Sequence, residues 1–181
     1  MKYNKEKLIR MLNEGINLDY VLFWKPRKDG VIDKGVFSQW HISSFSENGI
    51  VYNCAEQYMM AKKAELMGDY ITLETIMKET RPAELKKLGR KVQNFDSNLW
   101  DANKYNIVLN ASILKFGQSP VLLQYLLSTE DKVLVEASPY DDIWGIALSE
   151  EMNASRNPYL WKGENLLGFA LMEARDILFQ Q

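Results

Sequence analysis

Residues 53–68 read NCAEQYMMAKKAELMG, and this stretch decides the fold because it predicts a helix with charged side chains on its apolar side. At about 100° per residue, Glu56, Met60 and Lys63 lie on one face of such a helix. The opposite face is expected to hold Gln57, Tyr58, Lys62 and Glu65.

Glu56 and Lys63 therefore interrupt a face that should turn toward the protein interior. Seven residues of helix separate them by about 10 Å along the axis. Burying a charge is unfavourable unless the charge is paired or faces a pocket. The stretch predicts either a buried ion pair or an enclosed site with a carboxylate and an amine on its walls.

Both charged side chains also have structural interpretations, which the residues alone leave open. Asn53-x-x-Glu56 fits a capping box, in which the carboxylate bonds to backbone at the helix start and contributes about 1 kcal/mol. Lys63 could lay its stem on the core and extend its amine to solvent.

Composition limits the classes of function. The 181 residues suffice for one domain with a core, and a net charge of -2 gives no general basic surface for nucleic acid. The sequence has no apolar run of about 20 residues and no signal-like apolar core near its start, so we expect a cytoplasmic protein without membrane contact. The single cysteine, Cys54, and single histidine, His41, cannot form a disulfide or a structural zinc site, and no metal or cofactor is expected.

Capping and turn residues divide the chain into a mainly α domain with a small β element near its N-terminus. An N-terminal helical extension, residues 1–19, precedes the main domain, residues 20–181. Strands are expected at 20–24, 36–40, 50–52 and 132–137, with turns at Asp29-Gly30 and Asn48-Gly49. Helices are expected at 3–14, 53–67, 71–79, 82–89, 97–116, 121–127 and 165–179, and 138–161 is expected to be irregular.

Several short motifs, spread in order from about residue 23 to residue 178, carry a resemblance to a known family. They include Phe37-Ser38-Gln39-Trp40, Tyr52 through Ala64, Leu88-Gly89-Arg90, Leu134 through Pro139, Ile143-Trp144-Gly145 and Gly163 through Arg175. Together they resemble the NADAR (YbiA-like) family. The resemblance implies a single YbiA-like domain, mostly helical, that hydrolyses N-glycosidic bonds of ribosyl phosphates or ADP-ribose conjugates.

The substrate that this resemblance favours is ADP-ribose attached to guanine in nucleic acid or nucleotides. The alternative substrate is a ribosylamine phosphate intermediate of early riboflavin biosynthesis. A third possibility from another class is a module that binds NAD or ADP-ribose derivatives without turnover. A functional link to an ADP-ribosyltransferase toxin is a further expectation, because some members of the family counteract such toxins.

The resemblance also carries catalytic roles over to this chain. Glu56 is expected to be the acid/base group. Lys63 is expected to act on the ribose, either electrostatically or through a Schiff base that needs a neutral amine, although a nearby Glu56 carboxylate would favour the charged amine. Asp141 either shares the acid/base work, binds ribose hydroxyls or caps the following turn.

Six further residues are expected to bind substrate. Aromatic stacking on a base is worth about 1–3 kcal/mol, so tryptophans are suited to the base, and basic groups or a helix start are suited to phosphate. The residues are Trp40, Trp100, Trp144, Arg90, Lys115 and Asn165, of which Trp144 is suited to the base, and Arg90 and Lys115 to phosphate. The tryptophans have the alternative of a core role.

Two positions depart from the family's pattern. Ala147 stands where a glycine is often found, and Glu164 stands where a basic residue is common. Both departures concern substrate detail and leave the expected catalytic residues in place.

Overall fold

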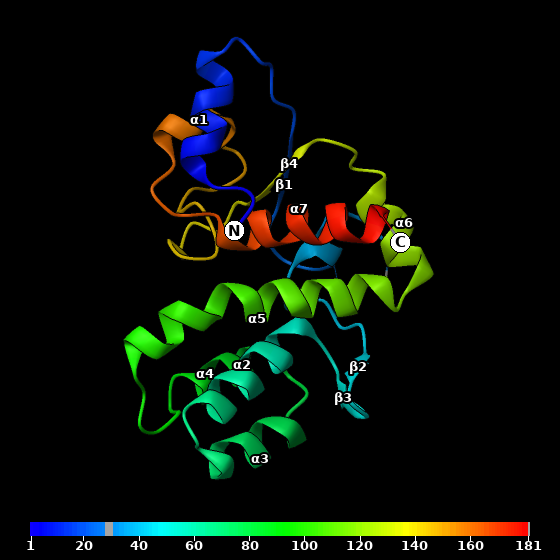
Figure 1. Cartoon of the computed structure of the whole chain (residues 1–181), viewed down its shortest axis with the longest axis vertical. Helices are drawn as coiled ribbons and strands as arrows, with labels where there is room; N and C mark the ends of the chain where they lie inside the picture. The colour runs from blue at the N-terminus through cyan, green and yellow to red at the C-terminus, as the bar shows by residue number, and fades with distance from the viewer. Residues whose placement is uncertain (28–30, 181) are drawn as a thin grey trace.

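The helix expected from residues 53–68 is α2, Ala55–Leu66, in the computed structural model of the chain, which describes residues 1–27 and 31–180 (Figure 1). It packs against α5, Ser97–Gly117, which runs across the middle of the molecule. Asp96 caps α5 by accepting hydrogen bonds from the N–H groups of Asn98 and Leu99. The mainly α fold is confirmed.

The other side of α2 contacts two shorter helices, α3, Tyr70–Lys78, and α4, Pro82–Gly89. Consequently α2 is enclosed on both sides, and Gln57 and Tyr58, on the face opposite Glu56, are only 1% and 2% exposed. Tertiary neighbours on the second side decide this burial, and the helical period alone does not reveal them.

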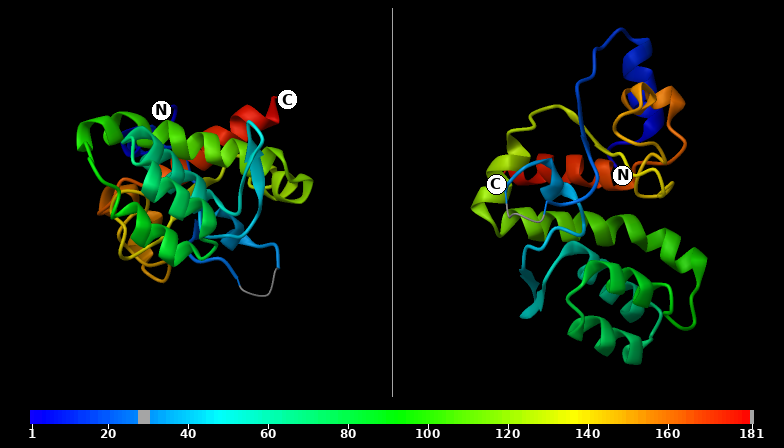
Figure 2. Two further views of the ribbon diagram at one scale, coloured as in Figure 1. Left: turned by 90° about the horizontal axis from the view of Figure 1, so that it is seen from below. Right: turned by 180° about the vertical axis from the view of Figure 1, so that it is seen from behind.

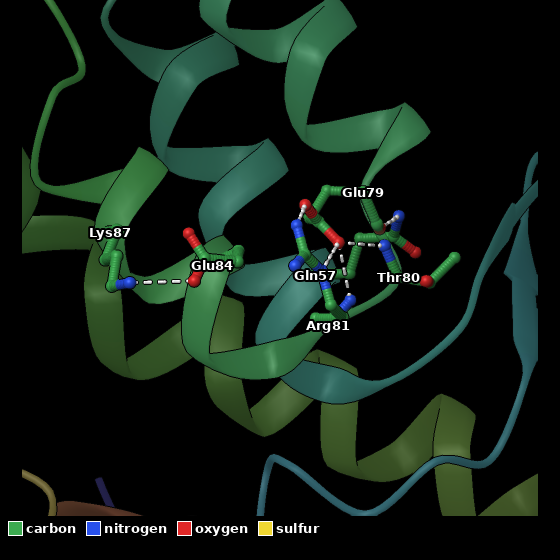
Figure 3. Close-up of polar contacts among 6 residues, drawn as sticks. All are labelled: Gln57, Glu79, Thr80, Arg81, Glu84 and Lys87. Atoms are coloured by element: carbon green, nitrogen blue, oxygen red, sulfur yellow. Dashed lines mark hydrogen bonds and ion pairs between the residues drawn. The ribbon is translucent and has the colours of Figure 1, made fainter.

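Gln57 ties the start of α2 to the end of α3. Its amide Nε2 donates to the carbonyl oxygens of Glu79 at 2.9 Å and Ile76 at 3.1 Å, and its Oε1 accepts from the N–H of Asn53 at 2.7 Å. Figure 3 shows Gln57 beside the link between α3 and α4, where the Glu79 carboxylate pairs with Arg81. The first turn of α2 is thereby fixed in position.

Two small sheets complete the core. β1, Tyr20–Phe23, pairs in parallel with β4, Val133–Glu136, and β2, Phe45–Glu47, pairs with β3, Ile50–Tyr52. The β2–β3 turn is the expected Asn48-Gly49, where both residues have positive φ, 50° and 81°.

The prediction of a strand at residues 36–40 is wrong. A 3-10 helix, η1, Lys34–Phe37, occupies its first part, because the Asp33 side chain accepts from the N–H of Gly35 and starts a turn. The segment then continues as a turn through Gln39 and Trp40. The Asp29-Gly30 turn lies outside the described residues.

β1, β4 and α7, Leu166–Phe179, lie on the far side of α5. Figure 1 and the right-hand view of Figure 2 show α7 running alongside α5. The α6 helix, Pro120–Leu127, follows α5 and begins at the capping residue Ser119. A β-carbon at Gly168 would lie 2.1 Å from the carbonyl oxygen of Leu134, so the absence of a side chain lets α7 approach β4 closely.

The N-terminal helix is α1, Lys5–Asn13, and its Leu8 is buried in the main core. Lys5 Nζ donates to the carbonyl oxygen of Trp161 at 2.6 Å, so the helix is held against the segment before α7. The boundary between an extension and the main domain at residue 19 stays a prediction. Across the described part of the chain, the helices are all too short or too polar to cross a membrane.

The segment between β4 and α7 forms an irregular loop with two short 3-10 helices, η2, Asn153–Arg156, and η3, Pro158–Leu160, as expected for residues 138–161. Within it Ala147 has a φ of 53°, in the left-handed region that glycine adopts more readily. Alanine in place of glycine at this position is therefore under backbone strain.

Replacing Ala147 with glycine is expected to raise the free energy of unfolding by about 0.5–1 kcal/mol, because relief of strain exceeds the added entropy of the unfolded chain. Urea unfolding followed by circular dichroism measures this change. The matched control is Ala102→Gly on the exposed side of α5, which should instead lose about 1 kcal/mol. An Ala147→Gly protein less stable than the original would contradict the assignment of strain.

Candidate active site

Glu56 and Lys63 line one cavity of about 340 Å³. One wall of this cavity comes from α2, α4 and the start of α5, and the other comes from the Gln39-Trp40 turn, the end of β4 and the loop at residues 140–144. The structure therefore contains a site with a carboxylate and an amine on its walls, as the charged face of α2 predicted, but the site is open to solvent on one side.

The Glu56 carboxyl is only 3% exposed. Burial raises its pKa to about 7, while the positive charge of Lys86 and a hydrogen bond from Trp40 partly oppose that shift. The capping-box interpretation is wrong, since Cys54 is the N-cap of α2 without a side-chain bond and the Asn53 N–H bonds to Gln57. Near neutral pH, Glu56 is thus able both to give and to accept a proton.

Lys63 does not extend into solvent. Its Nζ donates to the carbonyl oxygen of Gly89 at 2.8 Å and lies 4.3 Å from the ring centroid of Phe95 and 5.5 Å from that of Trp100. Burial lowers the pKa of the amine, and the expected opposing effect of the Glu56 carboxylate does not outweigh it. The direction of the shift favours the neutral amine that attack on a carbon requires.

Asp141 both caps a turn and faces the cavity. Its Oδ1 accepts from the N–H groups of Trp144 at 2.8 Å and Ile143 at 3.2 Å, and its Oδ2 lies 3.5 Å from Lys86 Nζ. One oxygen thus shapes the loop that carries Trp144. The other forms an ion pair at the cavity wall.

The three expected tryptophans all line the cavity and come from different parts of the chain. Trp40 follows η1, Trp100 lies in the first turn of α5, and Trp144 lies on the loop after β4. Each is partly exposed, so each presents aromatic surface that a ligand can contact. Arg90 joins them at the end of α4.

Lys115 and Asn165 do not reach the cavity, and the structure contradicts the contacts predicted for them. Lys115 is 2% exposed, and its Nζ donates to the carbonyl oxygens of Val36 at 2.6 Å and Ser38 at 3.0 Å. The fully buried Asn165 bonds to the backbone of β4, at Leu134 and Glu136. Both residues were chosen because they lie in family motifs. In the structure they hold the segments that carry site residues.

Several polar residues that line the cavity were not among the predicted site residues, and Gln39, Lys86 and Glu136 are three of them. Lys86 lies four residues before Arg90, a spacing that places both on one side of α4 and is a usable signal. Glu136 is the only charged residue of β4, but a strand of four residues has too short a pattern to show which end meets a cavity.

The fold is similar to that in the NMR structure of the Escherichia coli protein YbiA, with a TM-score of 0.72 and 25% identity over 91% of this chain and 88% of that one. The sequence model of the NADAR domain matches residues 22–179, and the chain belongs to this family.

Two curated relatives bear on the site. The chain is 44% identical to "N-glycosidase R617" of Acanthamoeba polyphaga mimivirus over 146 residues, which is 78% of this chain and 86% of that protein. It is 33% identical over 151 residues to "Riboflavin biosynthesis protein PYRR, chloroplastic" of Zea mays, which is 77% of this chain but 22% of the maize protein. The resemblance read from the motifs is confirmed.

Proposed function

We propose that this protein is an N-glycosidase that hydrolyses the bond between ribose C1 and a base nitrogen. The observation that carries the proposal is the buried Glu56 carboxyl, whose pKa of about 7 suits acid/base work near neutral pH, on the wall of a cavity. The name of the mimivirus relative, an N-glycosidase, supports the same class of reaction.

The cavity divides into parts with different chemistry. Lys86 and Arg90, on one side of α4, supply positive charge suited to phosphate, and Lys63 is suited to the sugar. The tryptophan surfaces of Trp40 and Trp144 suit the flat face of a base. A ribosyl phosphate carrying a base matches this set of groups.

The preferred substrate is ADP-ribose attached to guanine. A cavity of about 340 Å³ lies near the lower end of the range for ligand sites, so it would take the ribose and the cleaved base while the adenosine part extends outward. At the rim, Tyr140 is 87% exposed and its ring centroid lies 5.9 Å from that of Trp24, which offers aromatic surface for the second base. An ADP-ribosyltransferase that modifies guanine would have to supply this substrate.

A riboflavin-pathway ribosylamine phosphate is the second candidate, and the similarity to the maize riboflavin biosynthesis protein favours it. Such a substrate carries one phosphate and one base, and leaves the surface at Tyr140 unused. A third candidate, binding of NAD or ADP-ribose derivatives without turnover, would use the same cavity.

Incubation with both substrates separates these candidates. Guanosine carrying ADP-ribose on its base should yield free guanosine and ADP-ribose, resolved by liquid chromatography and mass spectrometry. Release of base from the ribosylamine phosphate alone would replace the guanine proposal with the riboflavin-pathway one. Binding of ADP-ribose without product from either compound would favour the binding module.

A further inference from the structure

Both backbone polar groups of Glu136 are hydrogen-bonded, which fixes the residue at the cavity. Its N–H donates to Asn165 Oδ1 at 2.9 Å, and its carbonyl oxygen accepts from the N–H of Ile146 at 3.0 Å. As the last residue of β4 it is also in register with Phe23 of β1. The start of its side chain is therefore fixed by the core, and the side chain lines the same cavity as Glu56.

One oxygen of the Glu136 carboxyl lacks a donor that would stabilise a negative charge. Its Oε2 is buried and has no hydrogen-bond partner among the described residues. Burial, together with the negative charges of Asp141 and Glu56, raises its pKa to about 8, and Lys86 only partly opposes this. At neutral pH the group therefore keeps its proton, on a wall open to a ligand.

Glu56 shares with Glu136 the effects of burial, Asp141 and Lys86, but it has further groups that favour its charge. Trp40 donates a hydrogen bond to it, and the charges of Lys86 and Arg90 favour its ionised form. Two carboxyl groups thus share one cavity and the charge of Lys86, but only Glu56 is also favoured in its ionised form by Trp40 and Arg90. Environments that separate two carboxyl groups in this way assign the acid to one and the base to the other.

We propose, building on the N-glycosidase function, that Glu136 is a second catalytic residue, which donates its proton to the leaving base while Glu56 serves as the base. As the bond between ribose C1 and the base nitrogen breaks, its electron pair goes to the nitrogen, which takes the proton of Glu136. Water forms the new bond to C1 and gives a proton to Glu56. The products are free base and ribose with a C1 hydroxyl, and proton transfer from Glu56 to Glu136 restores the site.

Single-turnover cleavage of ADP-ribosylated guanosine from pH 5.5 to 9.5 tests this assignment in the Glu136→Gln protein. Its rate constant at pH 7 should fall by about 100-fold or more, as for loss of a general acid. The unmodified protein should lose activity on the alkaline side as Glu136 ionises, and this dependence should disappear from the residual activity of the variant. Glu74→Gln, an exposed change on α3, is the matched control and should behave as the unmodified protein does.

A rate within about threefold of the unmodified protein, with the alkaline loss retained, would overturn the role of Glu136. ADP-ribose affinity, measured by calorimetry, should change little, whereas a merely structural loss would weaken binding along with rate. Failure of the unmodified protein to cleave any N-glycoside would instead refute the underlying function, so the two failures are distinguishable.

A second measurement covers the case in which the glutamine variant does not fold. Carbon-13 NMR of the unmodified protein, labelled at the glutamate carboxyl carbons, should show two signals that titrate above pH 6. The signal with the higher midpoint should remain in Glu56→Gln protein, with a lower midpoint because one neighbouring negative charge is gone. Absence of any glutamate signal titrating above pH 7 in the unmodified protein would contradict the proposal.

Discussion

Replacing Glu56 with glutamine is expected to lower the turnover of ADP-ribosylated guanosine by about 100-fold or more, while the affinity for ADP-ribose stays within about threefold. The amide keeps the size of the side chain and can still accept the hydrogen bond from Trp40, but it cannot take a proton from water. Rate constants at saturating substrate, together with calorimetric titration of ADP-ribose, measure the two effects separately.

Glu65→Gln is the matched control, because Glu65 lies on the same helix at the solvent edge and should leave turnover unchanged. The stability of the two variants should also differ with pH. Since burial raises the folded-state pKa of Glu56 from 4.5 to about 7, the unmodified protein loses stability as pH rises through that window, by up to about 3 kcal/mol. Glu56→Gln removes this loss and Glu65→Gln does not.

Equal turnover in Glu56→Gln and unmodified protein would remove the acid/base role and favour a module that binds without catalysis. A loss of both turnover and ADP-ribose affinity would point to a disturbed cavity. The pH dependence of stability separates these cases, because it reports on the carboxyl itself whether or not any substrate is turned over.

The sequence predicted α2 and its charged face well, because the pattern is local and spans several helical turns. It did not reveal that Gln57 and Tyr58 are also buried, since that depends on α3 and α4 packing against the second side. The sequence was least able to predict which residues far apart in the chain lie close together in space. Glu56 and Glu136 are 80 residues apart in the chain and meet only at the cavity.

Motif membership proved a poor guide to whether a polar residue contacts a ligand. Lys115 and Asn165 belong to matching motifs, yet each bonds to backbone within the core. Such residues hold the segments that carry site residues, and a single sequence does not distinguish that role from substrate binding. What would distinguish them is the hydrogen bonding of each side chain. Glu136, for example, lines the cavity, and its Oε2 has no hydrogen-bond partner among the described residues, which the sequence does not show.

Replacing Lys63 with methionine is expected to lower turnover of ADP-ribosylated guanosine by about 100-fold or more, because the partly buried amine is suited to act on ribose C1. In the covalent mechanism, the amine displaces the base from C1 of the opened sugar. It forms a C1–N bond to lysine as the bond from C1 to the base breaks. The base nitrogen takes the proton of Glu136 and one from the amine, and the second amine proton passes to Glu56. Water then hydrolyses the imine. Rapid-quench kinetics measures the loss.

Two further tests on Lys63 separate covalent from electrostatic action. Borohydride added during turnover should reduce the imine and add the mass of the sugar to a peptide at Lys63, and not at Lys62, whose amine is paired with Glu47 and Glu65. Lys63→Arg keeps the positive charge but cannot form the imine, so it should be as inactive as Lys63→Met. Substantial activity in Lys63→Arg, with no adduct in the active unmodified protein, would establish an electrostatic role, because charge alone would then suffice beside Trp100 and the Gly89 carbonyl oxygen.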